Sequence, residues 1–589
     1  MKHNRLATVL GSAFVMAALG TTTLWSSGAQ AFPGIFAGSA SKGGADAPRY
    51  NRSTQVVVFK KDGVTAVTVM VDYQGPLDKF IWLLPVPSDV KLDDVRTLRR
   101  DIVDHVDQVS APRFAEFWEM DPCEPGPAEQ EWERNLKVES MGFLGDEMLS
   151  QAAASKKVPK ELLVVIDPEF RDSLYKFSMI PAGADVAAAV KKQGYQLSEA
   201  AAKEAARYPT QQFLVVEVDT KQIEISGMDS AILSPIRFST RENVNIASTV
   251  GRSNIKDKQE LLVYVLDPTQ RYEVANYPNV FPPTNVLLDF KAKERMGELY
   301  SGLHDVVLSK NPGSFLVEYA WTTKGCGQPC ATSPLYLAEL LGLGGDVVEA
   351  NVPDKEKNPD PEPMTDEEKE AYKKLKPKER KELDAQRKEV ARRKALMARN
   401  DAFVLTRLHY RYGAADLPKD IELRPAGNIE GGIDLPKGPK GEASIKVTPT
   451  DKPSRLQTRF NNLHVSPSEV KCEKRERNRW GKAPRTYRGL RKIWQAQDLA
   501  TRNRTLFKLP EVIQTPLPNL GIVPVSAPGQ GPKTAAPAAS AQVGNAEAPV
   551  EKKGGCTLSG PPQPTGMGWL AAVGIALAWL GRRKNSRNA

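Results

Sequence analysis

The sequence predicts an α+β protein with a β-rich core of mixed or antiparallel strands that carries helical insertions. Two observations favour this class. Runs rich in β-branched and aromatic residues, beginning with 54–59 and 63–73, recur along much of the chain. A stretch from about 354 to 400 is instead charged on all faces, which is typical of solvent-exposed helices. The 589-residue chain is 41% hydrophobic, so it can bury a core and is long enough for two or more domains.

The N-terminus predicts a signal peptide. Lys2 and Arg5 precede a largely apolar run over residues 6–24, and the sequence A-Q-A ending at Ala31 is typical of a cleavage site. The mature chain is therefore expected to begin at Phe32, outside the cytoplasm. A retained N-terminal anchor is the alternative.

The formal net charge of +10 is misleading, because much of the excess lies at the two ends of the chain. Six of the 81 lysines and arginines, but none of the 71 acids, lie in residues 1–31 and 556–589. The remaining 75 cations exceed the acids by only four. We therefore expect no nucleic-acid partner.

The first strands of the body are expected to form a hairpin. Residues 54–59 and 63–73 flank an Asp-Gly pair, which is a strong hairpin signal. In the second strand valines alternate with Thr, Met and Asp, which predicts one buried face and one mixed face. Residues 80–87 (FIWLLPVP) are expected to lie in a sheet core and to leave it sharply at the Pro-x-Pro end.

Several segments share a pattern with a known bacterial family. They are Tyr73-Gln74-Gly75 with 80–87; Gly194 to Leu197 after a helical run over 184–192; 212–218 and 234–238, which look like two paired strands; Glu318 to Trp321; Cys326 and Cys330; a Leu-rich helix over 334–343; and a late strand over 405–412. Together they resemble the family called domain of unknown function 2330, over about residues 55–432. The resemblance implies no activity or cofactor.

The charged stretch is expected to form a solvated helical hairpin. Thr365 and Glu368 form a capping-box start, and Pro377 suits the first turn of a second helix. Glu370 and Lys374 are expected to pair across one turn. The alternative is a spur that docks a partner protein.

A later segment is basic with interleaved aromatic residues. Its members are Arg475, Arg477, Arg479, Trp480, Arg485, Tyr487, Arg488, Arg491, Lys492 and Trp494. Such a segment can bind anionic lipid or polysaccharide at a cell surface. The alternative is a solvated face whose arginines meet acids of the body. Residues 518–555, rich in Pro, Ala and Gly, are expected to form a flexible tether.

The last 34 residues have the character of a sorting or anchor tail. After Cys556 come a short spacer, an apolar run over residues 567–580 and a terminal cluster of arginines and lysine. At about 1.5 Å per residue the run is shorter than the roughly 30 Å bilayer core. An ordinary transmembrane anchor is one interpretation, and a buried core helix is another.

The tail as a whole resembles the MYXO-CTERM sorting signal of myxobacteria. This resemblance implies that a sorting protease removes the tail next to Cys556 and that a lipid is attached to that thiol. The protein would then be displayed on the outer membrane.

The other four cysteines, Cys123, Cys326, Cys330 and Cys472, are expected to form up to two disulfides with three possible connectivities. The favoured interpretation of Cys326 and Cys330 is a structural disulfide that closes a tight loop. The alternatives are a redox-active pair, a zinc site completed by Cys123 and Cys472, and separate pairing of each cysteine with a distant one.

The sequence contains none of the common hydrolase, metalloprotease, P-loop or EF-hand motifs. Four histidines follow the signal peptide, namely His105, His304, His409 and His464, and none has metal-ligand spacing. His409 lies in a strand pattern and is expected to be a satisfied structural histidine. We therefore expect no catalytic residues, metal or cofactor. The predicted role is a non-enzymatic binding or structural component of the envelope. The alternative is an extracytoplasmic hydrolase or thiol-redox enzyme that uses Cys326 and Cys330.

The predicted organisation has six parts. They are a signal peptide (1–31), a β-rich body (32–350), the charged helical insertion (351–400), a continuation of the body with the basic segment (401–517), a linker (518–555) and the tail (556–589).

Overall fold

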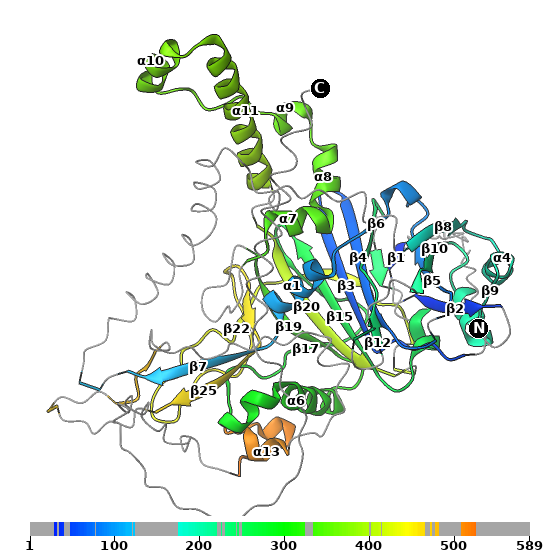
Figure 1. Ribbon diagram of the computed structural model, residues 1–589. Helices are drawn as coiled ribbons and strands as arrows, with labels where there is room; N and C mark the ends of the chain where they lie inside the picture. Colours follow the sequence, from blue (N-terminus) through cyan, green and yellow to red (C-terminus); the bar gives the residue numbers. More distant parts are fainter. Residues whose placement is uncertain are drawn as a thin grey trace, which may run out of the picture. The chain divides into compact units, whose positions relative to one another are not determined.

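The β-branched segments form the middle of a 13-stranded mixed sheet in the computed structural model (Figure 1). Its central strands are ordered β4 (Val64–Tyr73), β3 (Ser53–Lys61), β15 (Gln259–Asp267), β20 (Val404–Tyr412) and β19 (Phe315–Thr322). Only the β3–β15 pair among these is parallel. With helices present as well, the α+β class is confirmed.

The chain divides into two units, Met1–Thr534 and Ala535–Ala589, and every described residue belongs to the first. The described residues are 29–31, 34–40, 47–76, 78–120, 122–123, 175–220, 225–226, 230–242, 244–246, 250–323, 334–399, 402–413, 415–416, 418–465, 472–473, 477–481 and 508–525. Within these ranges, no helix combines the length and the apolar character needed to cross a membrane.

The predicted β3–β4 hairpin is confirmed. Asp62 and Gly63 have φ angles of 51° and 73°, which suit the tight turn that an Asp-Gly pair favours. The expectation of a mixed second face on β4 is wrong as regards exposure. Thr68, Met70 and Asp72 are buried like the valines between them, because the sheet is covered on both sides.

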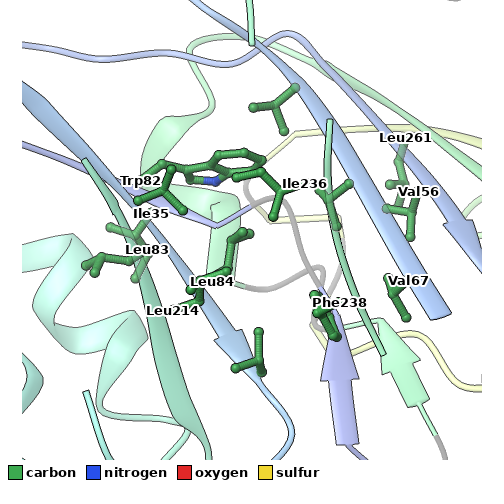
Figure 2. Close-up of a cluster of buried hydrophobic side chains, with 14 of the residues drawn as sticks. Ile35, Val56, Val67, Trp82, Leu83, Leu84, Leu214, Ile236, Phe238 and Leu261 are labelled. Carbon is green, nitrogen blue, oxygen red and sulfur yellow. The ribbon is translucent and has the colours of Figure 1, made fainter. Parts of the chain in front are cut away.

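One face of the large sheet packs against a five-stranded sheet of order β8-β10-β5-β2-β9. Figure 2 shows Trp82 and Leu84 of β5 (Phe80–Val86) on one side of this core and Val56 and Val67 on the other. β5 is the central strand, as expected. However, it does not end at the first proline, because Pro85 is still paired with Phe213.

The outer strands of the five-stranded sheet correct a predicted pairing. β10 (Gln212–Val218) pairs with β5 and with β8 (Tyr175–Ile180). β13 (Ile236–Thr240) instead pairs with β4 in the large sheet. The two segments 212–218 and 234–238 are therefore strands, but they lie in different sheets. The remaining strands here are β2 (Ile35–Ser39) and β9 (Tyr195–Gln196).

Helices cover the opposite face of the large sheet. α1 (Arg100–Ser110) packs there together with a segment made of α7 (Leu337–Leu340), a π-helical turn over Leu341–Gly345 and α8 (Asp346–Asn351). Gly344 has a φ angle of 152°, and a Cβ atom there would lie 2.7 Å from side-chain atoms of Phe59 and Ala66. Glycine is therefore required where this helical segment approaches the sheet. The predicted Leu-rich helix is present but is shorter and broken.

A four-stranded sheet has the order β18-β25-β7-β26. Its strands are β18 (Val286–Leu287), β25 (Arg459–His464), β7 (Arg113–Glu119) and β26 (Trp480–Gly481). β7 and β25 pair in parallel although more than 300 residues separate them. The disulfide Cys123–Cys472 follows β7 and precedes β26, so it ties together the chain segments beside these strands.

The charged insertion forms α10 (Asp366–Lys374) and α11 (Pro377–Arg399). The capping box at Thr365 and the helix start at Pro377 are confirmed. The expected Glu370–Lys374 pair is wrong, since Glu370 pairs with Lys373 at 2.6 Å. No described residue of α11 is buried. At its end Arg399 holds Glu349 of α8 through two hydrogen bonds of 2.7 Å.

Most other elements are short. They are β1 (Ala29–Ala31), β6 (Arg96–Thr97), β11 (Ile225–Ser226), β12 (Ser230–Ile232), β14 (Val244–Ile246), β16 (Arg271–Val274), β17 (Asn279–Val280), β21 (Leu423–Ala426), β22 (Ile429–Gly431), β23 (Thr448–Pro449), β24 (Arg455–Gln457), α4 (Val186–Lys192), α5 (Glu199–Ala205), α6 (Met296–Lys310), α9 (Asp354–Lys357), α13 (Leu509–Val512), and 3₁₀ turns at Leu92–Asp94, Val250–Asn254, Phe290–Arg295 and Pro518–Leu520.

Candidate functional site

The two faces of β20 differ sharply in polarity. Alternate residues of a strand point to opposite faces. Leu408, Tyr410 and Tyr412 belong to the apolar core between the sheets. Arg407 and His409 lie on the other face and are almost completely buried, with exposed fractions of 1% each. The helix-covered side of the sheet therefore contains a line of cationic side chains.

Carboxylates from four other elements partner these side chains. Arg407 donates from Nε to Glu318 Oε2 of β19 at 2.6 Å, and also binds Asp107 of α1. His409 lies between two carboxylates, with Nδ1 2.7 Å from Glu318 Oε1 and Nε2 2.9 Å from Glu260 Oε2 of β15. Since a carboxylate only accepts, both ring nitrogens must donate.

The line continues to Arg411, which completes it at the other end. Its Nε lies 3.4 Å from Glu260 Oε1, and its Nη1 donates to Asp305 of α6 at 2.7 Å. We use the name charged cluster for the seven residues Asp107, Arg407, Glu318, His409, Glu260, Arg411 and Asp305. Acids and bases alternate along it, so each buried charge has an opposite neighbour, as burial requires.

A β-bulge places Glu318 at the centre of the charged cluster. β19 pairs with β20 through Val317↔Leu408 and then Tyr319↔Arg407, so Glu318 is the extra residue between the two pairs. A bulge bends a strand and redirects a side chain. Glu318 has no exposed surface, and its carboxylate contacts Arg407, His409 and the hydroxyl of Tyr300.

α6 brings a second histidine to the same place. Tyr300 and His304 are four residues apart, so they lie on one face of the helix. The ring of His304 packs 4.3 Å from that of His409, measured between centroids. One ligand-type atom each from His304, Glu318 and His409 lies within 4.8 Å of the others, and all three residues are buried. We call these three residues the His–Glu–His triad.

The neighbours decide the ionisation of the charged cluster. Burial alone would lower the pKa of His409, but Glu318 and Glu260 raise it to about 9. Burial alone would raise the pKa of Glu318, but His409 and Arg407 hold it below its usual value. The pKa of Arg407, which burial would lower, is raised by Asp107 and Glu318. Without a bound cation, His409 is therefore an imidazolium at neutral pH.

The predicted site residues fall partly within the described chain. Cys123 and Cys472 are bonded to each other. That bond removes both from the zinc interpretation of Cys326 and Cys330 and rules out long-range pairing with them. Cys326, Cys330, Phe32 and Cys556 lie outside the described residues. The expected cleavage residue Ala31 is the last residue of β1.

The described part of the basic segment makes contacts within the protein. Arg477 lies 3.2 Å from the carboxylate of Glu119, and Trp480 is buried and donates from Nε1 to the carbonyl of Gly438 at 2.9 Å. The hypothesis that Trp480 stacks on a surface ligand is therefore wrong. The other aromatic residues and most arginines of this segment lie outside the described residues.

Sequence reasoning treated the histidines singly and missed their convergence. The expectation that His409 is a satisfied buried histidine agrees with its two carboxylate partners. The available signal was the pattern Arg-x-His-x-Arg at residues 407–411 inside a hydrophobic strand. Such a pattern predicts a buried charged face that requires acidic partners. The distant residues Glu318 and His304 carry no comparable signal.

Comparison with known families gives one match. The chain matches the bacterial family described as uncharacterized protein conserved in bacteria (DUF2330), over residues 30–424, which is more than half of its length. The protein belongs to this family. The match includes the whole His–Glu–His triad and ends before Cys472 and β25. The expected resemblance is thus confirmed, with somewhat different boundaries from 55–432. No curated protein and no solved structure matches the chain.

Proposed function

We propose that this DUF2330 protein is a secreted component of the cell envelope, displayed on the cell surface, with a binding or structural role. The observation that carries the proposal is the bond between Cys123 and Cys472. Structural disulfides form and persist in oxidising compartments outside the cytoplasm. The signal-peptide pattern of residues 1–31 and the sorting-type tail after Cys556 point to the same compartment.

The β1 strand is compatible with removal of the leader. β1 ends at Ala31 and pairs, among the described strands, with β14. Cleavage after Ala31 would therefore remove a two-stranded pairing and leave the 13-, five- and four-stranded sheets with all their described strands.

A non-enzymatic role is supported by the burial of the charged groups. Within the described residues, the members of the His–Glu–His triad have exposed fractions of 2% or less. A general acid, base or nucleophile must reach its substrate. No observation on the described residues favours the alternative of an enzyme that uses Cys326 and Cys330.

Intact mass of the protein recovered from outer membranes tests the proposal. The expected chain begins at Phe32, ends near Cys556 and carries a lipid adduct. Replacing Cys556→Ser is expected to abolish the adduct and release the protein from the membrane, whereas the spacer control Ser559→Ala should behave as wild type. A lipid-free chain that extends to Ala589 would make the tail a plain membrane anchor. A chain that still begins at Met1 would contradict secretion through a cleaved leader.

A second measurement addresses the basic segment. Binding to anionic lipid vesicles or acidic polysaccharide should fall steeply between low and high salt if arginines 485, 488 and 491 contact the polymer. Replacing these three arginines with glutamine should remove the binding, whereas Arg477→Gln, which alters an internal ion pair, should change it little. Salt-independent binding, or none, would contradict an anionic ligand.

A further inference from the structure

The ligand chemistry of the His–Glu–His triad is that of a transition-metal site. Two imidazoles and one carboxylate are a common ligand set for zinc and related divalent ions, whereas magnesium and calcium prefer oxygen ligands only. The three ligand atoms lie within 4.8 Å of one another. Ligands about 2.0–2.2 Å from a common ion are roughly 3–4 Å apart, so small side-chain movements would close the site.

The outer contacts of the triad have the form that metal ligands require. The Nε2 atom of His409 faces Glu260 Oε2 at 2.9 Å, which leaves Nδ1 directed to Glu318. The second oxygen of Glu318 accepts from Arg407 Nε at 2.6 Å. A carboxylate behind a ligating histidine and a hydrogen-bond donor behind a ligating carboxylate orient both ligands. The hydroxyl of Tyr300, also bound to Glu318, is suitably placed to contribute to a fourth position.

Charge balance also calls for a cation at this point. The charged cluster has four carboxylates against the guanidinium groups of Arg407 and Arg411. Arg113, which lies close enough to Arg407 for its pKa to be lowered mainly by burial and further by that charge, adds a third cation. At least one buried negative charge is left over, and uncompensated buried charge is costly. Either a proton on His409 or a metal ion can neutralise it.

We propose that His304, Glu318 and His409 bind one divalent transition-metal ion of the zinc class, which fastens α6 to β19 and β20. The ion replaces the proton between His409 Nδ1 and Glu318 Oε1, so the hydrogen bond of 2.7 Å becomes two bonds to the metal. The three ligands come from three elements separated in sequence, and all are buried. The site is therefore structural, and it does not depend on where the protein is displayed.

Metal content of the full-length chain tests this proposal. The chain is stripped with a chelator, dialysed against zinc, washed and measured for metal, and its melting temperature is recorded with and without zinc. The expected result is one tightly held zinc ion per chain and a higher melting temperature. Cobalt in place of zinc should give visible absorption bands of a low-coordination nitrogen and oxygen site.

The decisive variant is His304→Phe, which keeps a ring beside His409 but removes a ligand. It should lose the zinc, the cobalt bands and the zinc-dependent rise in melting temperature. The matched control is His105→Phe, because His105 also contacts a glutamate, Glu339, at 2.8 Å, but lies outside the triad. This control should keep one ion per chain. Should His304→Phe fail to fold, His304→Gln serves the same purpose with a smaller polar side chain.

A positioning variant sharpens the result. Glu260→Gln leaves all three ligands in place but alters the partner of His409 Nε2, so zinc affinity should fall about 10–100-fold. The proposal is wrong if the folded wild-type chain binds neither ion and its melting temperature ignores both. It is also wrong if His304→Phe binds like wild type, or if His105→Phe loses the ion equally. In the first case the charged cluster is held by protons alone.

Discussion

α11 and the helix-covered face of β20 use the same kinds of charged residue in opposite surroundings. α11 has no buried residue among those described, and its ion pairs, such as Arg392–Glu389 at 2.8 Å, are open to solvent. Arg407 has the same guanidinium group but is 1% exposed and held by two buried acids. The chemical groups are alike, and their energetic consequences differ because water can replace a lost partner only in α11.

The largest expected effect comes from breaking the buried side of this comparison. Arg407→Ala leaves Asp107 and Glu318 buried without their cation, so the free energy of unfolding should fall by about 3–5 kcal/mol. Urea denaturation of the full-length chain measures it. Arg407→Lys keeps the charge but not the planar fork, and an intermediate loss is expected. A loss below about 1 kcal/mol for the alanine variant would mean that water reaches the cluster.

A covalent link in a third region sets a scale for these charge effects. Replacing both Cys123 and Cys472 with serine should lower the free energy of unfolding by about 2–5 kcal/mol, since the bond closes a loop of 349 residues. The same denaturation under non-reducing conditions measures it, and Cys556→Ser is the control that should leave stability unchanged. Equal stability of the double variant and wild type would contradict a structural role for the bond.

Asp72 sharpens the comparison because it is buried but held by amide groups rather than by an ion pair. Its Oδ1 accepts from the backbone N–H groups of Arg52 and Ser53, and burial raises its pKa to about 6. The folded state therefore binds more protons than the unfolded state between about pH 4 and pH 6. The contribution of Asp72 to stability should fall as the pH rises through that window, by roughly 1–3 kcal/mol.

The pH dependence of Asp72→Asn checks this sign. An asparagine cannot ionise, so the difference in unfolding free energy between the variant and wild type should change across pH 4–6 and level off above it. The variant should gain relative to wild type as the pH rises. A constant difference across the window would show that Asp72 titrates normally.

The smallest expected effect lies on the exposed side. Arg392→Ala removes a half-exposed ion pair of α11 and should change the free energy of unfolding by no more than about 0.5 kcal/mol. It is the matched partner of Arg407→Ala, because the two substitutions remove the same group. A loss above about 1 kcal/mol would indicate that α11 is covered in the working protein, for example by a docked partner.

Local patterns predicted local structure well. The Asp62-Gly63 turn, the capping box at Thr365 and the helix start at Pro377 each depend on residues within one turn, and all three are present. Strand identity was also predictable, since β10 coincides with the expected 212–218. Which strands pair was not, because pairing depends on packing between distant segments, and 234–238 joined a different sheet.

The charged cluster shows why the site could only be found in part. Arg407, His409 and Arg411 announce a polar face through their spacing in one strand. Their partners come from α1, α6, β15 and β19, and the position of Glu318 depends on a bulge that shifts the register by one residue. A one-residue shift moves a side chain to the other face, so no periodicity in β19 could place this carboxylate correctly.

The parallel pairing of β7 with β25 has a consequence for how the chain acquires its structure. β7 leaves the ribosome more than 300 residues before its neighbour, and Cys123 waits equally long for Cys472. Contacts between such distant segments make folding slow, because a long loop must close before they form. The four-stranded sheet is thus assembled only after nearly the whole body has been synthesised, and any truncation before residue 472 leaves β7 an unprotected edge.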